Sequence, residues 1–133
     1  MKLIYSLKRI TAISILSFGF LSLYSQGTDS REFIKAFHSA DNYYYYDENY
    51  EKAATLYEPL YKSHPDNCNL AAKLGICYLN LDDKKPQALE LLKKASTNYA
   101  KTVREYTQTG SKAPNDVMLY LAIAYHRNDS LDK

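Results

Sequence analysis

The sequence contains no tryptophan, and among its 133 residues it has only four glycines, four prolines and two cysteines. It also lacks a glycine-rich phosphate loop, a nucleophile elbow and a paired-carboxylate motif. Its three histidines, His38, His64 and His126, are far apart in the sequence and do not have the spacing of a zinc site. These absences predict that the chain is not an enzyme and holds no cofactor or metal ion.

A surplus of positive charge is also missing. Lys2, Lys8 and Arg9 lie at the start of the chain, and without them the formal net charge falls from +2 to −1. Nucleic-acid binding needs a clustered basic face, so we do not expect it here. The remaining residues are rich in Leu, Ala and Tyr, which is typical of a small helical domain with little core to spare.

Residues 1–26 have the pattern of a signal peptide. A positively charged start precedes an apolar and hydroxyl-rich run at 10–23, and the small residues Ser22, Ser25 and Gly27 mark a cleavage region. The run of about 14 residues is shorter than the roughly 20 that a membrane-spanning helix needs, which favours cleavage over a single transmembrane anchor. No cysteine lies near the cleavage region, so the lipidation site of a bacterial lipoprotein is missing. We therefore predict an exported protein, periplasmic or associated with the outer membrane.

Export would place both cysteines in an oxidising compartment, where disulfides form. Cys68 and Cys77 are nine residues apart on one predicted helix. This spacing puts them on opposite faces and about 13.5 Å apart along the axis, whereas a disulfide needs Cα atoms within roughly 7 Å. We expect two buried or half-buried thiols and no intrachain bridge.

The chain contains an internal repeat of helical hairpins. Tyr78 stands 34 residues after Tyr44, and the pattern before Tyr78 recurs before Tyr125. Apolar residues at spacings of three and four give each helix a buried stripe, and small residues let the partner helix approach. The pattern positions are Phe37, Ala40, Asp41, Tyr44, Tyr50, Ala53, Tyr57, Leu60 and Pro65 in the first unit, Ala71, Leu74, Gly75, Tyr78, Ala88, Leu92 and Ala95 in the second, and Met118, Leu121, Ala122 and Tyr125 in the third.

This pattern resembles the tetratricopeptide repeat. The resemblance implies an all-α fold of antiparallel helical hairpins, stacked as a short solenoid whose last repeat is incomplete. It divides the domain at residues 27–133 into repeats at about 34–67, 68–100 and 115–133. Asp41 and Leu60 depart from the small residues that are usual at their positions.

Residues 101–114 are an insertion between the second and third units. Because Ala95 and Leu121 are 26 residues apart, about a dozen residues more than in an uninterrupted repeat, we expect an overlong helix through Lys101 and Tyr106 and then a polar loop. The third unit stops at Lys133, before the alanine of its second helix. A repeat cannot bury its apolar face alone, which predicts that the chain is the front of a longer protein or a truncated product.

The order of these features has a narrower resemblance. It is similar to the front of envelope proteins of Bacteroidetes-type bacteria. The features in order are the signal peptide, the tyrosine-rich hairpin with Tyr50-Glu51-Lys52-Ala53, the helix at 74–80, the junction at 112–114 and the helix at 121–126. In those proteins tetratricopeptide repeats precede a WD40-like propeller and an OmpA-like peptidoglycan-binding domain, and some members serve type IX secretion and gliding. Neither further domain is present here, so no residue of this chain is expected to bind peptidoglycan.

The resemblance also implies a partner-binding groove on the first helices of the units. The four consecutive tyrosines at 43–46 cannot all face the core of one helix, and an exposed tyrosine is a good anchor for a partner. They could instead pack against the segment after the signal peptide or against the rest of a longer protein. The groove is more apolar and aromatic than a charged-peptide clamp, and it suits a protein or peptide ligand. Its predicted residues are Lys35, His38, Asn42, Tyr45, Tyr46, Ala72, Ile76, Leu79, Leu119, Ile123 and His126.

We therefore expect a scaffold that mediates protein contacts in the cell envelope. Two alternatives stay open. One is a glycan-binding protein of the nutrient-uptake type, in which helical repeats frame an outer-surface site, although such proteins usually carry the lipidated cysteine that is missing here. The other is a truncated product with no independent function.

Overall fold

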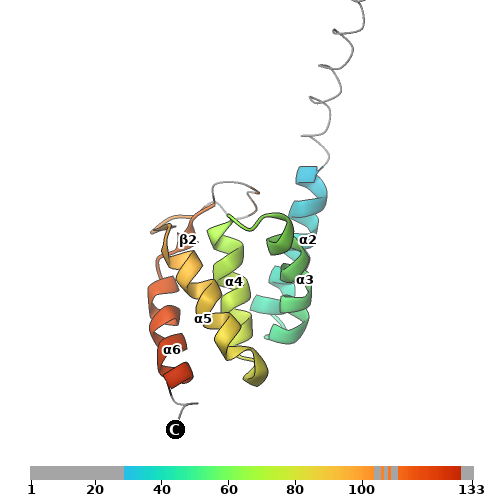
Figure 1. Cartoon of the computed structure of the whole chain (residues 1–133). Helices are drawn as coiled ribbons and strands as arrows, with labels where there is room; N and C mark the ends of the chain where they lie inside the picture. The colour runs from blue at the N-terminus through green and yellow to red at the C-terminus, as the bar shows by residue number, and fades with distance from the viewer. Residues whose placement is uncertain (1–28, 104–105, 107, 109–110, 130–133) are drawn as a thin grey trace, which may run out of the picture. The chain divides into compact units, whose positions relative to one another are not determined.

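The computed structural model describes residues 29–103, 106, 108 and 111–129. Residues from Phe33 on belong to one compact unit, and the preceding unit, which ends at Glu32, contributes only residues 29–32 to the described part. The predicted signal peptide at 1–26 lies outside the described residues. Helices make up most of this part, so the predicted all-α class is confirmed (Figure 1). They are α2 (Asp29–Tyr45), α3 (Tyr50–Ser63), α4 (Cys68–Leu79), the 3-10 turn η1 (Asp82–Lys84), α5 (Lys85–Ser96) and α6 (Val117–Asp129).

Asparagine side chains fix the starts of two helices. The side chain of Asn49 accepts a hydrogen bond from the Lys52 N–H at 3.0 Å, and the side chain of Asn67 accepts one from the Leu70 N–H at 3.0 Å. Each bond satisfies one backbone donor that the first turn of a helix leaves without a partner. The chain therefore enters α3 and α4 at defined residues after short connections.

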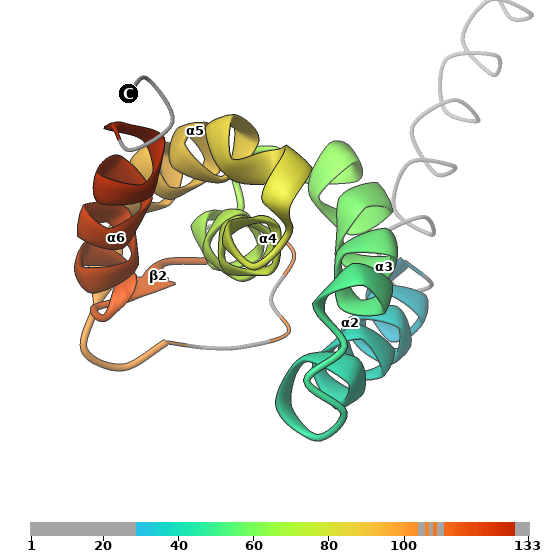
Figure 2. The same ribbon diagram turned by 90° about the horizontal axis from the view of Figure 1, so that it is seen from below.

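Helix α4 lies at the centre of the compact unit. It packs against α3, α5, α6 and the short strand β2 (Ala113–Pro114), and Figure 2 shows it enclosed by these elements when viewed end-on. Every residue of α4 from Cys68 to Cys77 is buried. Apart from Asn69 and Lys73 the buried residues of α4 are apolar or small on all sides, and such a helix is expected to be buried in this way.

The core has two clusters that meet at α4. The first lies between α2, α3 and α4 and includes Phe37, Tyr57 and Leu70, all fully buried. The second lies between α4, α5 and α6 and includes Leu92 and Val117. Burial of such side chains is the main favourable contribution to folding, about 1.5–3 kcal/mol for each large apolar residue.

Gly75 sets the distance between α4 and α5. A Cβ atom on Gly75 would lie 2.9 Å from Leu92 Cγ, which is closer than such atoms approach, and 3.2 Å from Leu91 Cβ, which is a tight contact. The two helices can therefore pack at this separation only because the residue has no side chain. The sequence pattern, in which small residues admit the partner helix, describes this contact correctly.

The insertion at 101–114 does not begin with the overlong helix that we predicted. Helix α5 ends at Ser96, and residues Tyr99–Ala100 form strand β1, which pairs in parallel with β2. The hydroxyls of Ser96 and Thr97 donate to the carbonyls of Lys93 and Lys94 at 2.8 and 2.7 Å. Side chains that bond to nearby backbone groups offer the chain an alternative to the helix, and the helix stops here.

The two cysteines are free and buried, as predicted. Cys68 belongs to the cluster between α4 and α5, whereas Cys77 belongs to the cluster between α2, α3 and α4. Burial raises the pKa of the Cys77 thiol to about 12, although the charge of Lys73 acts in the opposite direction. Since the thiolate is the reactive form, Cys77 is protected both by its surroundings and by its ionisation.

We expect neither thiol of the folded protein to react with a small disulfide reagent such as dithionitrobenzoate at pH 8. Both groups should react within minutes after unfolding in guanidinium chloride, because the buried positions are then open to solvent. The measurement is the release of nitrothiobenzoate with time, with and without denaturant. Rapid reaction of one thiol in the native protein would show that its part of the core opens easily.

Candidate functional site

The α2 part of the predicted groove is exposed. Lys35, His38 and Asn42 lie at the surface, and Tyr45 and Tyr46 keep 55% and 82% of their area accessible. The Lys73 ammonium donates to the Tyr45 hydroxyl at 3.0 Å and lies 4.5 Å from the centre of its ring. The Tyr45 ring is therefore held in one place although more than half of it faces solvent. We call Asn42, Tyr45 and Tyr46 the tyrosine face.

The His38 ring already contacts another side chain of the protein. It stacks on Tyr106, with 3.9 Å between the ring centres. Tyr106 also contacts Phe37 edge-on, with 5.2 Å between centres. A partner that reached His38 would have to share it with this aromatic contact.

The α4 part of the predicted groove is not a surface. Ala72, Ile76 and Leu79 are 1%, 8% and 3% exposed. They belong to the same buried cluster as Ala113 of β2 and Val117 of α6. These three residues are core residues here, because the chain after α5 returns as β2 and α6 and covers them. No pattern in the sequence predicts that the insertion ends in a strand against α4.

The α6 part of the predicted groove is divided between core and surface. Leu119 is 62% exposed and His126 is exposed, whereas Ile123 is half-buried against the second core cluster. Since the α4 residues between α2 and α6 are covered, the predicted residues do not line one open trough.

Lys73, which holds Tyr45 of the tyrosine face, also belongs to a buried ion pair. Lys73 of α4 donates to Asp41 of α2 at 2.8 Å, and both side chains are almost fully buried. The Tyr57 hydroxyl of α3 also donates to Asp41, so three helices meet at one carboxylate. Burial by itself would lower the pKa of Lys73, but the hydrogen bonds to Asp41 and Tyr45 raise it above its usual value. Burial and the bond to Asp41 also raise the pKa of Tyr57.

This network explains a departure in the repeat pattern. Asp41 stands where a small residue is usual, and it is the partner of Lys73. Sequence reasoning noted the departure at Asp41 but did not pair it with Lys73. The available signal was a lysine in the middle of an otherwise apolar helix, where a buried charge needs a partner.

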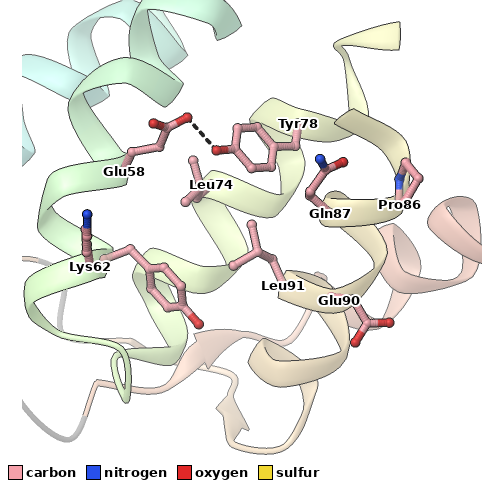
Figure 3. Close-up of a pocket in the computed structure, with 9 residues that line it drawn as sticks. Glu58, Lys62, Leu74, Tyr78, Pro86, Gln87, Glu90 and Leu91 are labelled. Carbon is pink, nitrogen blue, oxygen red and sulfur yellow. Dashed lines mark hydrogen bonds between the residues drawn. The ribbon is translucent and has the colours of Figure 1, made fainter. Parts of the chain in front are cut away.

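A separate cleft of about 550 Å³ lies between α3 and α5, and residues of α4 form part of its lining. Figure 3 shows Glu58 and Lys62 on the α3 side, Pro86, Gln87 and Glu90 on the α5 side, and Leu74 and Leu91 between them. Tyr61 and Tyr78 complete the lining. The Tyr78 hydroxyl donates to Glu58, and burial together with this bond raises the pKa of Tyr78, so it stays a donor.

The sequence pattern did not predict this cleft. The cleft lies within the range of volumes typical of binding sites, about 300–1,000 Å³.

A comparison with protein-family models, curated proteins and solved structures finds no match to this chain. Its function has to be inferred from its own residues.

Among the described residues, no three His, Cys, Asp or Glu side chains are grouped so that they could hold a metal ion. None of the helices in this part has the length and apolar composition of a membrane span. Cys77 is buried and protonated. Among the groups with raised pKa values, Lys73, Tyr57 and Tyr78 make hydrogen bonds between helices, in the Asp41 network and in the Tyr78–Glu58 pair. What these residues offer to a partner is aromatic and apolar surface.

Proposed function

We propose that the helices are tetratricopeptide-type hairpins and that the chain is a protein-binding scaffold of the cell envelope. The tyrosines at corresponding pattern positions support the repeat. A lysine ammonium lies over the ring of each: Lys73 over Tyr44 at 5.4 Å, Lys84 over Tyr78 at 5.5 Å and Lys93 over Tyr125 at 5.6 Å. The third of these tyrosines is the most open, 45% exposed.

The tyrosine face is the observation that carries the binding role. Tyr45, the last residue of α2, and Tyr46, which directly follows it, expose large aromatic surface, and Tyr45 is held by Lys73. A rigid, exposed tyrosine gives up little conformational entropy on binding and buries a large area, which is why tyrosine is frequent among the residues that dominate binding energy. Export to the envelope is supported by the signal-peptide pattern at 1–26 alone.

The double variant Tyr45→Ala, Tyr46→Ala should lose at least about tenfold in partner affinity, because a dominant interface residue contributes 2 kcal/mol or more. Both side chains are exposed, so helicity by circular dichroism should not change. The measurement is affinity capture from envelope extracts of the source cells, with identification and titration of the captured protein. Tyr99→Ala is the matched control, since Tyr99 is 49% exposed but lies in β1. Equal capture by the double variant and the control would refute the tyrosine face as the binding surface.

Exposed tyrosine rings can also stack on sugar rings, so the same face would suit a glycan-binding protein. Calorimetry with starch and with cell-wall polysaccharide separates the two functions. Heat of binding that disappears in the double variant would favour the glycan role, and its absence with both polysaccharides would leave the protein scaffold.

A further inference from the structure

We propose that the cleft between α3 and α5 is a second partner site, and that it binds an amphipathic helix whose apolar residues enter the cleft beside a lysine or arginine. The proposal rests on the proposed function in one respect, that the partner is a polypeptide. It concerns α3 and α5, whereas the tyrosine face lies on α2, so the two surfaces can be tested separately.

The interior of the cleft is apolar. Leu74 of α4 forms its base, and Leu91 of α5 and Tyr61 of α3 are half-buried on either side. Aliphatic side chains that enter such a space leave water and gain roughly 25 cal/mol for each Å² of apolar surface that they bury. The space lies between two helices, which is the kind of groove that receives the apolar face of a third.

The charged residues on the rim of the cleft are Glu58 and Lys62 on the α3 side and Glu90 on the α5 side. Glu58 uses one carboxylate oxygen to accept the Tyr78 hydroxyl, and Glu90 pairs with Lys93 at 2.9 Å. Tyr78 holds the Glu58 carboxylate at the mouth of the cleft (Figure 3). A cationic group beside the apolar residue of the partner would complement this carboxylate.

The spacing of charges along α3 favours a helix over a small amphiphile. Glu58 and Lys62 are one helical turn apart on the same side of the cleft, so they present two opposite charges at a separation of about 6 Å. A partner helix repeats its side chains at the same interval. It can therefore place a basic residue near Glu58 and an acidic or neutral residue near Lys62 while its apolar stripe faces Leu91.

The direct test uses the full chain labelled with ¹⁵N and two synthetic helical peptides of about 15 residues, long enough to hold some helix in water. One peptide is made of leucine and lysine and the other of leucine and glutamate, with the same apolar stripe. We expect the lysine peptide to bind and to shift the amide resonances of residues around Glu58, Lys62, Gln87 and Leu91. The glutamate peptide should bind more weakly. Equal binding of both peptides, or shifts confined to other helices, would overturn the proposal.

Two variants and a control complete the test. Glu58→Gln keeps an acceptor for Tyr78 but removes the charge, and it should weaken the lysine peptide about threefold to fivefold, the size of one partly exposed charge pair. Asp83→Asn makes the same change of net charge in the exposed η1 turn and should have no effect. Gln87→Phe places an aromatic ring at the rim from an exposed position and should abolish binding by filling the cleft. Peptide binding that survives Gln87→Phe would contradict the assignment.

Two further arms separate this proposal from its alternatives. Octylammonium chloride carries the same charge and an apolar tail without a helix, and binding as tight as that of the peptide would replace the polypeptide by a small amphiphile. The Tyr45→Ala, Tyr46→Ala variant should bind the lysine peptide as the natural chain does. Loss of peptide binding in that variant would move the site to α2 and overturn the cleft proposal, while the proposed scaffold function would stand.

Discussion

Replacing Lys73 with methionine should lower the free energy of unfolding by about 3–5 kcal/mol, the usual result of removing one partner from a buried ion pair. Asp41 would remain buried without its ion-pair partner, and the hydrogen bond from the Tyr57 hydroxyl cannot neutralise its charge. The contacts of the Lys73 ammonium with the rings of Phe37, Tyr44 and Tyr45 would also be lost. Denaturation by urea, followed by circular dichroism at the helix bands, measures the change.

Lys94→Met is the matched control for this prediction. Lys94 pairs with Asp66 at 3.4 Å, but both side chains are largely exposed. An exposed pair contributes about 0–1 kcal/mol, so this variant should unfold close to the natural chain. The double variant Asp41→Leu, Lys73→Met removes both charges and should recover most of the loss. If Lys73→Met alone were as stable as the control, the ion pair would not hold α2 to α4.

The same pair predicts how stability changes at high pH. The pKa of Lys73 in the folded protein is raised above its usual 10.5, so folding favours the protonated form. Its contribution to stability is therefore complete below pH about 10.5 and is lost as the pH rises through the folded pKa. The pKa of Tyr57, also raised, acts in the same direction. The natural chain should thus lose stability at alkaline pH more steeply than the Asp41→Leu, Lys73→Met variant.

Leu92→Ala should destabilise the protein by about 2–5 kcal/mol, because Leu92 is fully buried between α4 and α5 and its removal leaves a cavity beside Gly75. The measurement is again urea denaturation. Leu119→Ala is the control, since Leu119 is 62% exposed on α6 and should change stability by less than about 0.5 kcal/mol.

A second substitution tests the contact itself. Gly75→Ala alone should destabilise, because the new Cβ would lie 2.9 Å from Leu92 Cγ. In the Leu92→Ala background the 2.9 Å contact is removed and the 3.2 Å contact with Leu91 Cβ remains, so the higher helix propensity of alanine, up to about 1 kcal/mol, should offset more of the cost. A smaller destabilisation by Gly75→Ala in that background is the expected result of the double-mutant cycle. Additive effects would show that Gly75 does not set the separation of the helices.

Local rules were enough to predict most of the helices and much of the core, but not the end of α5 at Ser96. The apolar and small residues of the pattern, such as Phe37, Ala53, Leu92 and Ala95, are buried, because periodic apolar stripes leave little choice about which side of a helix faces inward. The placement of the two cysteines in different clusters also follows from helix geometry alone. These predictions depend on residues that are close in sequence.

Predictions that depended on distant residues failed. Ala72, Ile76 and Leu79 were assigned to a groove because they lie on the face of α4 that an ordinary repeat would leave open, and β2 and α6 cover that face. Likewise, pairing Lys73 with Asp41 requires knowing that α2 and α4 lie side by side. Sequence periodicity reports which residues of a helix are buried, but not which later segment buries them.

The parallel pairing of Tyr99 with Ala113 and of Ala100 with Pro114 joins the two ends of the insertion. The two strands thus set the distance between the ends of the connecting segment. Helices α5 and α6 therefore do not have to move when the number of residues in that segment changes. The entropic cost of a longer connection grows only with the logarithm of its length, by about 0.6 kcal/mol for each doubling. The segment between β1 and β2 should accept an added peptide tag or a fluorescent reporter while the register of α5 against α6 is kept.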